Sequence, residues 1–375
     1  MPTRRQFLQQ SSTLAALVAT GVVGATGRLA LGNQEKRKLK LLILGGTGFL
    51  GPCIVRRAVE RGHTMTLFNR GKTDPTAFPD LEKFKGDRNV DADLEQLAGR
   101  EWDAVIDTSA YFPRQTRASA RLFAATVGQY LLISTISVYR PLDAPNADES
   151  APLMELPANV DAEKLQTIGA NYGALKAMCE QEAEKAMPGQ VTNIRPGLIV
   201  GPDDDSDRFT YWPLRVAAGG EVLAPGTADD RVQIMDVRDL ANFVIHCAEK
   251  TTVGVMNATG PKGGLPIGEL LAACKRATKS DATFTFVPDD FLDEQKISGW
   301  SDLPTWISPR QPGGGLVNLN VERAVAAGLA FRSAEETARD TLDWFRTTQK
   351  GRELRGGLKR DAETKALAAW HAKKS

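Results

Sequence analysis

The chain has 375 residues, of which 42% are hydrophobic and 25% charged, and its formal net charge is +1. This composition supports one large domain or two closely joined ones, and the near-zero charge gives no electrostatic footprint for nucleic acid. Four scattered cysteines without a CxxC pair and only three histidines lack the spacing of a metal site, so we expect no metal and discount histidine-based catalysis.

The N-terminus predicts an export signal. Arg4 and Arg5 precede a weakly apolar stretch from Leu14 to Ala25, which is too short to span a bilayer. We expect residues 1–32 to be a twin-arginine signal peptide and residues 33–38 a polar linker. The mature protein would then be periplasmic or extracellular, delivered folded by the twin-arginine translocase, with no stable membrane insertion. The alternative is a disordered basic N-terminus.

Residues 39–195 begin with a phosphate-binding pattern. A buried strand is expected over Leu39–Leu44, a helix over Pro52–Arg61 and a second strand over Thr64–Phe68. The glycine-rich turn between the first strand and the helix is typical of a dinucleotide site, where the pyrophosphate lies on the helix N-terminus. The cofactor contacts expected from this turn are Gly45, Thr47, Gly48, Phe49, Leu50 and Gly51.

The end of the second strand bears on the choice of cofactor. Sites for NAD usually place an acidic residue here to hold the ribose hydroxyls. This chain has the neutral Asn69 followed by two cations, Arg70 and Lys72, which suit a 2′-phosphate better. We therefore expect NADP or NAD, with NADP favoured. The alternative is that both cations only solvate a loop.

Further strands and helices alternate along the first half of the chain. This order predicts an α/β fold, a Rossmann-type doubly wound parallel sheet, with a smaller C-terminal substrate-binding region. Ligands of such sheets bind at the carboxyl ends of the strands. Asp87, Thr108 and Ser109 fall at such ends and are expected to line the adenosine and ribose pocket.

A tyrosine and a lysine four positions apart form the second informative pattern. Tyr172 and Lys176 would share one face of a helix, where an ammonium group can lower the pKa of a phenol. Such a tyrosine can exchange a proton with a substrate hydroxyl. The hydroxyl-rich segment Ser134–Tyr139, after a predicted strand, offers side chains that could orient the substrate oxygen. By itself, the spacing would also fit an ordinary surface pair.

With these motifs together, the chain resembles the extended short-chain dehydrogenase/reductase family, specifically its NAD(P)-dependent epimerase/dehydratase group. The resemblance covers about Lys40 to Trp344. It implies that Tyr172 is the acid/base, that Lys176 tunes it and holds the nicotinamide ribose, and that Thr135 orients the substrate. The family's 4,6-dehydratases carry an Asp-Glu pair directly after that threonine. This chain has Ile136 there, which disfavours dehydration.

The second half is expected to shape the substrate site. Residues 196–348 would form a substrate-binding region interleaved with the last sheet elements, and residues 349–375 a charged helical tail. The resemblance places Arg231 where an arginine can reach a phosphate or ribose, although a surface ion pair fits equally well. Trp300 and Trp306 could stack on a sugar or close the core.

The sequence therefore favours an NAD(P)-dependent oxidoreductase or epimerase that acts on a secondary hydroxyl of a carbohydrate-like small molecule. Export argues against nucleotide sugars, which are cytoplasmic. Two alternatives use the same fold without turnover: a sensor that holds NADP(H), and an RNA-binding protein similar to chloroplast stem-loop binding proteins. We expect no nucleic-acid partner, and the resemblance allows a homodimer.

Overall fold

The computed structural model describes residues 37–142 and 144–374. The predicted signal peptide, residues 1–32, and most of the predicted linker lie outside the described residues. Among the described residues, no helix combines the length and the apolar character that crossing a bilayer requires.

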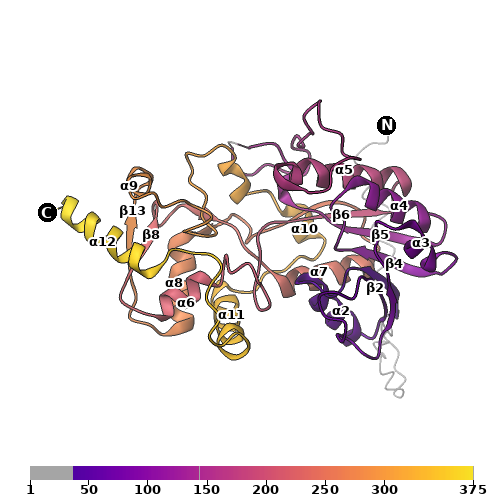
Figure 1. Cartoon of the computed structure of the whole chain (residues 1–375), viewed down its shortest axis with the longest axis horizontal. Coiled ribbons are helices and arrows are strands. Elements are labelled where there is room, and N and C mark those ends of the chain that lie inside the picture. Colours follow the sequence, from indigo (N-terminus) through magenta and orange to yellow (C-terminus); the bar gives the residue numbers. More distant parts are fainter. Residues whose placement is uncertain (1–36, 143, 375) are drawn as a thin grey trace, which may run out of the picture. The chain divides into compact units, whose positions relative to one another are not determined.

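A seven-stranded parallel sheet is built mainly from the first half of the described chain and is completed by a strand from the second half (Figure 1). Its order is β3-β2-β1-β4-β5-β6-β11, so the chain starts in the middle, runs to one edge and returns to extend the other. This order confirms the predicted Rossmann-type fold. The strands are β1 (Lys40–Leu44), β2 (Thr64–Asn69), β3 (Glu82–Lys85), β4 (Trp102–Asp107), β5 (Val127–Ile133), β6 (Val191–Pro196) and β11 (Gly254–Ala258).

Helices cover both faces of this sheet, which explains why β1 is apolar at successive positions. Leu41 and Ile43 pack toward α2 (Leu50–Glu60) and α7 (Val237–Lys250). Leu42 and Leu44 point the other way and pack with residues of α4 (Pro113–Phe123) and α5 (Tyr172–Ala186). In Figure 1 the two helix pairs lie on opposite sides of the strands.

A second core forms the C-terminal lobe, which consists of α6, β8, α8, β13, α9, α11 and α12. Here β8 (Glu221–Pro225) pairs in parallel with β13 (Thr283–Val287). Trp212 and Trp306 lie at the centre of this core, 0% and 1% exposed. The helices are α6 (Tyr211–Ala217), α8 (Ile267–Thr278), α9 (Asp289–Glu294), α11 (Ala334–Thr348) and α12 (Arg360–Lys374).

Short elements connect these parts. Two short strands flank residues 233–234, and between them the side chain of Gln233 accepts a hydrogen bond from Leu198 N (2.9 Å). They are β9 (Arg231–Val232), which pairs with β12 (Leu265–Pro266), and β10 (Met235–Asp236), which pairs with β7 (Ile199–Val200). The others are α3 (Asp91–Leu94), α10 (Glu322–Ala326), and the 3₁₀ turns η1 (Glu95–Leu97), η2 (Ile136–Val138), η3 (Gly169–Asn171) and η4 (Gly314–Val317).

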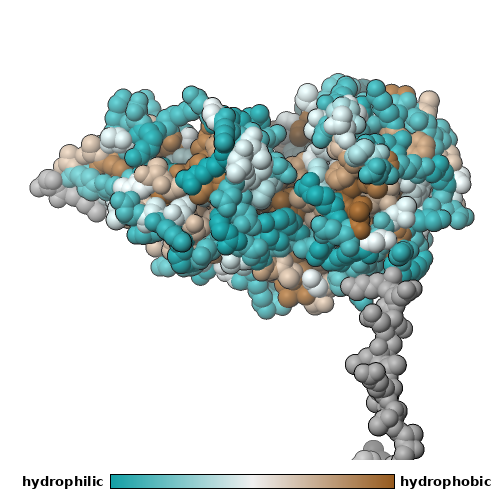
Figure 2. Space-filling model, turned by 90° about the horizontal axis from the view of Figure 1, so that it is seen from below, coloured by the Kyte–Doolittle hydropathy of each residue, from teal (hydrophilic) through white to brown (hydrophobic). Residues whose placement is uncertain are grey.

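The charged tail is built into the C-terminal lobe. On α12, Glu363 is 0% exposed and pairs with Arg215 (2.6 Å), while Leu367 joins the second core. The face of the molecule in Figure 2 is mostly hydrophilic, with apolar residues in separate patches. The apolar side chains of both cores are therefore largely internal on this side.

Candidate functional site

A cavity of about 480 Å³ opens at the carboxyl ends of the central strands. It brings together the glycine-rich turn, the end of β5, the start of α5 and parts of the C-terminal lobe. The described residues that line it are Gly48, Phe49, Leu50, Gly51, Thr108, Tyr111, Ile133, Ser134, Thr135, Ile136, Ser137, Tyr172, Lys176, Pro196, Gly197, Leu198, Ile199, Arg208, Gln233, Trp300, Ile307, Leu316 and Val317.

The glycine-rich turn has the shape of a phosphate cradle. A Cβ on Gly51 would lie 2.5 Å from the backbone of Gly46, so only glycine allows α2 to begin so close to β1. A Cβ on Gly48 would meet nothing within 4 Å, so this backbone faces open space at the helix N-terminus. Free N–H groups at such a position suit an anion, and the turn fits a dinucleotide pyrophosphate.

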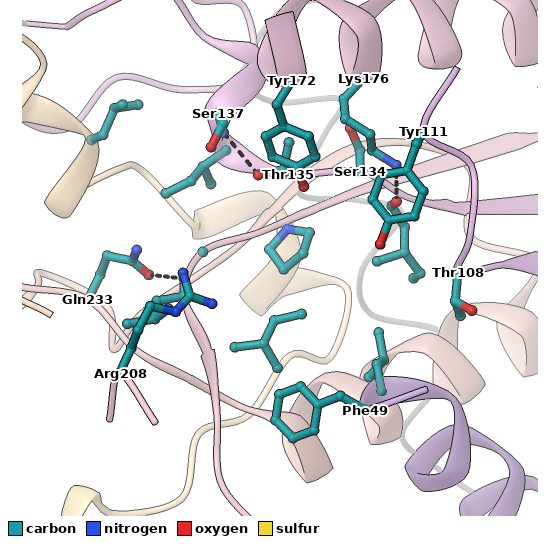
Figure 3. Close-up of a pocket in the computed structure, with 18 of the residues that line it drawn as sticks. Phe49, Thr108, Tyr111, Ser134, Thr135, Ser137, Tyr172, Lys176, Arg208 and Gln233 are labelled. Atoms are coloured by element: carbon teal, nitrogen blue, oxygen red, sulfur yellow. Dashed lines mark hydrogen bonds between the residues drawn. The ribbon is translucent and has the colours of Figure 1, made fainter. Parts of the chain in front are cut away.

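Tyr172 and Thr135 are brought together by a close contact between α5 and η2. Gly173 permits it, since a Cβ there would lie 2.1 Å from the carbonyl oxygen of Ser137. Thr135 caps η2 by accepting a hydrogen bond from Ser137 N (3.1 Å). The phenol of Tyr172 and the hydroxyl of Thr135 lie next to each other in the cavity (Figure 3), as the resemblance implied.

Lys176 is fixed one helical turn further along α5. It is 3% exposed, and its Nζ donates to the carbonyl oxygens of Ala110 and Ile133, both at 2.7 Å. Burial lowers the pKa of this ammonium group. The expected lowering of the Tyr172 pKa by Lys176 is wrong for this geometry. Burial raises the pKa of Tyr172, and the opposing effect comes first from its hydrogen bond with Thr135.

Ser134 is a site residue that the sequence analysis considered but did not select. It lines the cavity, is 4% exposed, and its hydroxyl has no hydrogen-bond partner among the described residues. An unsatisfied buried hydroxyl is costly. A ligand with a polar group at this point would satisfy it, so Ser134 also fits a cofactor in this cavity.

The residues after β2 and β3 form a charged rim outside the cavity. Asn69 accepts a hydrogen bond from Gly71 N (2.8 Å), which shapes the turn that carries Arg70 and Lys72. Both cations are exposed and have no ion pair among the described residues. Asp87 accepts from Asn89, and this bond, together with Arg70 and Lys72 nearby, lowers its pKa.

The end of β4 is tied by a buried network that the sequence analysis missed. Asp107 is 0% exposed and accepts from Arg88 (2.5 and 2.7 Å) and from the hydroxyl of Tyr130 (2.6 Å). Thr108 and Ser109 both donate to the carbonyl of Leu44 at 3.1 Å. Thr108 lines the cavity, whereas Ser109 does not. Arg88 and Asp107 lie 19 residues apart, and no motif in the sequence indicates that they form an ion pair.

The three expected substrate residues separate in space. Trp300 lines the cavity, is 39% exposed and packs under the guanidinium of Arg208. Trp306 is buried and donates to Asp230 (2.9 Å), so it closes the core, which is the second role left open for it. Arg231 lies in a neighbouring cavity of about 530 Å³ and donates to the carbonyl of Gly264 (3.4 Å), and it forms no ion pair, one of the two roles left open for it, with any described residue.

Comparisons with known proteins agree with this arrangement. The sequence model of the NAD dependent epimerase/dehydratase family matches residues 41–258. The chloroplast stem-loop binding protein of 41 kDa b from Arabidopsis thaliana is 27% identical over 313 residues, which cover 73% of this chain and 76% of that protein. The 2-alkyl-3-oxoalkanoate reductase of Stenotrophomonas maltophilia is 30% identical over 209 residues, 48% of this chain and 59% of that protein.

A solved structure shows the same fold. The UDP-glucose 4-epimerase of Thermus thermophilus, determined as a complex with NAD, aligns with a TM-score of 0.57 and 18% identity. The alignment covers 82% of this chain and 99% of that one. The C-terminal lobe is therefore included in the likeness as well as the sheet.

Proposed function

The chain belongs to the NAD dependent epimerase/dehydratase family, and we propose that it is an NAD(P)-dependent oxidoreductase or epimerase with Tyr172 as its acid/base. One observation supports this most. Tyr172, Thr135 and Lys176 line a single cavity together with the glycine-rich turn that fits a dinucleotide. Proton transfer and cofactor binding are thereby brought to one place.

The residues divide the work of oxidising a secondary alcohol. The nicotinamide of the bound cofactor supplies the hydride acceptor. Thr135 orients the substrate oxygen by a hydrogen bond, and Tyr172 takes the hydroxyl proton as a phenolate. Lys176, held by two backbone carbonyls, places a positive charge beside this reaction and can reach the cofactor ribose. If the hydride were returned to the opposite face of the ketone carbon, and the Tyr172 proton to its oxygen, the result would be epimerisation.

We infer a carbohydrate-like substrate from the walls of the cavity and from the relatives. Tyr111 (43% exposed) and Trp300 (39% exposed) both line the cavity, and aromatic rings are suited to stacking on the faces of sugars. The UDP-glucose 4-epimerase fold neighbour acts on a sugar, as its name says. The reductase relative supports the simpler reaction, in which a ketone is reduced without epimerisation.

The decisive experiment compares wild-type protein with Tyr172→Phe. Loaded with NADP⁺ or NAD⁺, the wild type should form reduced cofactor with members of a panel of sugars and sugar acids, followed at the nicotinamide absorbance. The variant should lose turnover by about 10²- to 10⁴-fold, the usual contribution of an acid/base group, with nearly unchanged cofactor affinity. Undiminished turnover by Tyr172→Phe would remove the acid/base role.

The stem-loop binding relative supplies a rival function of another class. An RNA-binding protein needs a positive surface, and this chain has a formal net charge of +1. Salt-sensitive binding of a stem-loop RNA, together with no reduced cofactor from any panel member, would favour the rival. A sensor that holds NADP(H) would bind cofactor and do neither.

We also propose that NADP is preferred over NAD, because Arg70 and Lys72 lie exposed just after β2 and form no ion pair with any residue that the structure describes. Replacing Arg70 by Ala should weaken NADP(H) binding by roughly tenfold, the effect of one charge-assisted hydrogen bond, and leave NAD(H) binding unchanged. Fluorescence titration measures both. Arg140→Ala is the matched control, because this exposed arginine does not line the cavity. Equal losses for both cofactors would contradict the proposal.

Finally, we propose that the enzyme works outside the cytoplasm. The support is the twin-arginine pattern at Arg4 and Arg5, placed before a nucleotide-binding fold that would be loaded with cofactor before export.

A further inference from the structure

Two side chains with N–H groups that find no acceptor among the described residues lie on the wall of the cavity across from Lys176 and Tyr111 (Figure 3). We propose that Arg208 and Gln233 bind an anionic oxygen group of the substrate, a carboxylate or a phosphate. The substrate would then be an acidic sugar-like alcohol and not a neutral sugar. This inference rests on the proposed function and names the substrate class of the same site.

Arg208 has a guanidinium group with most of its donors unused. Its Nε donates to the hydroxyl of Ser206 (3.0 Å), and no ion pair joins it to a carboxylate among the described residues. Of the nearby acids, Asp207 is held by Arg352, from which both of its oxygens accept (2.6 and 2.7 Å). Asp204 Oδ1 accepts from Ser206 N (2.9 Å), whereas its buried Oδ2 has no hydrogen-bond partner among the described residues. The Asp204 carboxyl interacts electrostatically with Arg208 but forms no ion pair with it. The planar end of Arg208 is therefore available, and its geometry matches a carboxylate or phosphate.

The loop that carries Arg208 is anchored on both sides of it. Asp207 is 0% exposed through its pair with Arg352 and a bond from Arg355 N (2.9 Å). Phe209 is also 0% exposed and belongs to the second core. With its two neighbours fixed, Arg208 has little freedom to withdraw from the cavity. A preorganised cation loses less entropy when it binds an anion.

The side chain of Gln233 is also fixed by other residues, so that its amide N–H groups are available to a ligand in the cavity. Its Oε1 accepts from Leu198 N (2.9 Å) and from the hydroxyl of Thr259. A backbone N–H can only donate, so this bond fixes the oxygen of the amide toward Leu198. Nε2 then carries two N–H groups, and neither has an acceptor among the described residues. Gln233 is 6% exposed and lines the cavity, so a ligand oxygen is the fitting partner.

Trp300 supports the guanidinium from outside. The Cζ of Arg208 lies 5.4 Å from the centre of the Trp300 ring, within the range of a cation–π contact. The backbone N of Trp300 donates to Leu303 O (3.2 Å) and Trp306 O (3.0 Å), which holds this exposed side chain in its loop. Arg208 and Trp300 together thus form one side of the cavity, and the guanidinium gives that side a positive charge.

The charge of the cavity favours an anion. Lys176 and Arg208 are the charged side chains among its described lining residues, and no carboxylate lines it. Lys176 is already bound by two carbonyls, whereas Arg208 is not. The two lie on different sides of the cavity, so an anion at Arg208 stays separate from a cofactor ribose at Lys176 (Figure 3). Arg208 is also close enough to favour the phenolate of Tyr172 electrostatically.

The experiment measures binding, so that it does not depend on turnover. Full-length protein loaded with oxidised cofactor is titrated by calorimetry with two matched pairs: D-glucuronate with D-glucuronamide, and D-glucose 6-phosphate with D-glucose. We expect the anionic member of at least one pair to bind about 10- to 100-fold tighter, as charge-assisted hydrogen bonds imply. Which pair discriminates tells a carboxylate from a phosphate.

Substitutions assign the effect to Arg208. Arg208→Gln should remove the preference and leave cofactor affinity unchanged, which also shows that the variant is folded. Arg208→Lys should keep part of the preference, and Arg140→Gln should keep all of it. Arg231→Gln tests the neighbouring cavity, which shares Ile307 and Val317 with this one.

Four results would overturn the inference, and the first three concern the preference for the anion. They are equal affinity within both pairs for the wild type, a preference that survives in Arg208→Gln, and a preference lost in Arg231→Gln alone. A loss of cofactor affinity in Arg208→Gln would also overturn it, because Arg208 would then serve the cofactor phosphates. Failure of the proposed function is seen separately, as acid-selective binding without any reduced cofactor.

Discussion

The glycines of the phosphate-binding turn differ in what one added methyl group would touch. At Gly48 a side chain meets open space, while at Gly51 it meets the backbone of Gly46 at 2.5 Å. We therefore expect Gly48→Val to keep wild-type stability and lose cofactor binding. Gly51→Ala should lose both, because strand and helix must separate. Thermal unfolding and cofactor titration of the two variants check this.

Retained cofactor affinity in a stable Gly48→Val variant would show that the pyrophosphate lies elsewhere. Gly48 and Gly51 lie three residues apart, but a side chain would point into open space at the first and into the backbone of Gly46 at the second.

The pH dependence of alcohol oxidation should report the environment of Tyr172. Burial raises the pKa of the phenol above its usual range, and the hydrogen bond from Thr135 opposes this. The phenolate, which accepts the substrate proton, is the minor form near neutrality, so kcat/KM should rise with pH there. In Thr135→Val the opposing bond is absent, and the rise should move to higher pH.

The position of the rise, and not its height, is the quantity to compare, since Thr135→Val also weakens substrate orientation. Thr135→Ser keeps the hydroxyl and serves as the control. A rise at the same pH in wild type and Thr135→Val would contradict the hydrogen bond as a determinant of this pKa.

Among single residues, the sequence predicts best those whose role depends on neighbours only a few positions away in the chain. Tyr172 and Lys176 are one helical turn apart, so local spacing predicted that they act together, whereas the family resemblance singled out Thr135 within its hydroxyl-rich segment. Arg208 and Gln233 could not be predicted in this way. They reach the cavity only because distant segments fix them, through Arg352 for the Arg208 loop and Leu198 for Gln233.

The last helix shows how one element can complete a core. On α12, Glu363 accepts from Arg215 (2.6 Å), Arg360 (2.7 Å) and Leu223 N (3.0 Å), although its neighbour Asp361 is exposed. Glu363→Ala leaves the guanidinium of Arg215 buried without its carboxylate. We expect a loss of about 3–5 kcal/mol in the free energy of unfolding, measured in urea.

Asp361→Asn is the matched control in the same turn of α12, and it should change stability by about 0.5 kcal/mol or less. Equal stability of the two variants would mean that the buried ion pair does not hold α12 to α6.

Elements buried on both faces were the most predictable ones. The apolar runs of β1 and β5 are long enough to identify strands without knowing their neighbours. The two-residue strands β9 and β10 were not predictable, since their pairing depends on β12 and β7, which lie elsewhere in the chain. The sequence of α12 is rich in charged residues, and nothing in its composition indicates that Glu363 is the one that is buried.

At the level of the whole molecule, the predicted export signal would determine the compartment in which the protein acts. Replacing Arg4 and Arg5 together by Lys keeps the positive charge but removes the twin-arginine pattern. We expect the wild type in the periplasmic or extracellular fraction and the double variant folded in the cytoplasm, both with cofactor bound. Cell fractionation followed by cofactor assay of each fraction is the measurement.

Efficient export of the double Lys variant would indicate a signal that needs positive charge alone. Cytoplasmic retention of the wild type would restore nucleotide sugars as leading substrates, and their phosphates would then be a second kind of anion for the cavity.

The ion pair between Arg215 and Glu363 joins positions 148 residues apart and has a consequence for synthesis on the ribosome. While the chain is still being translated, Arg215 emerges long before the carboxylate that neutralises it. The C-terminal lobe therefore cannot finish folding until α12 has been synthesised and has left the ribosome. Nascent chains arrested before Arg360 should be cut by protease within β8, whereas released chains resist. Completion of this lobe thus reports that synthesis has passed α12.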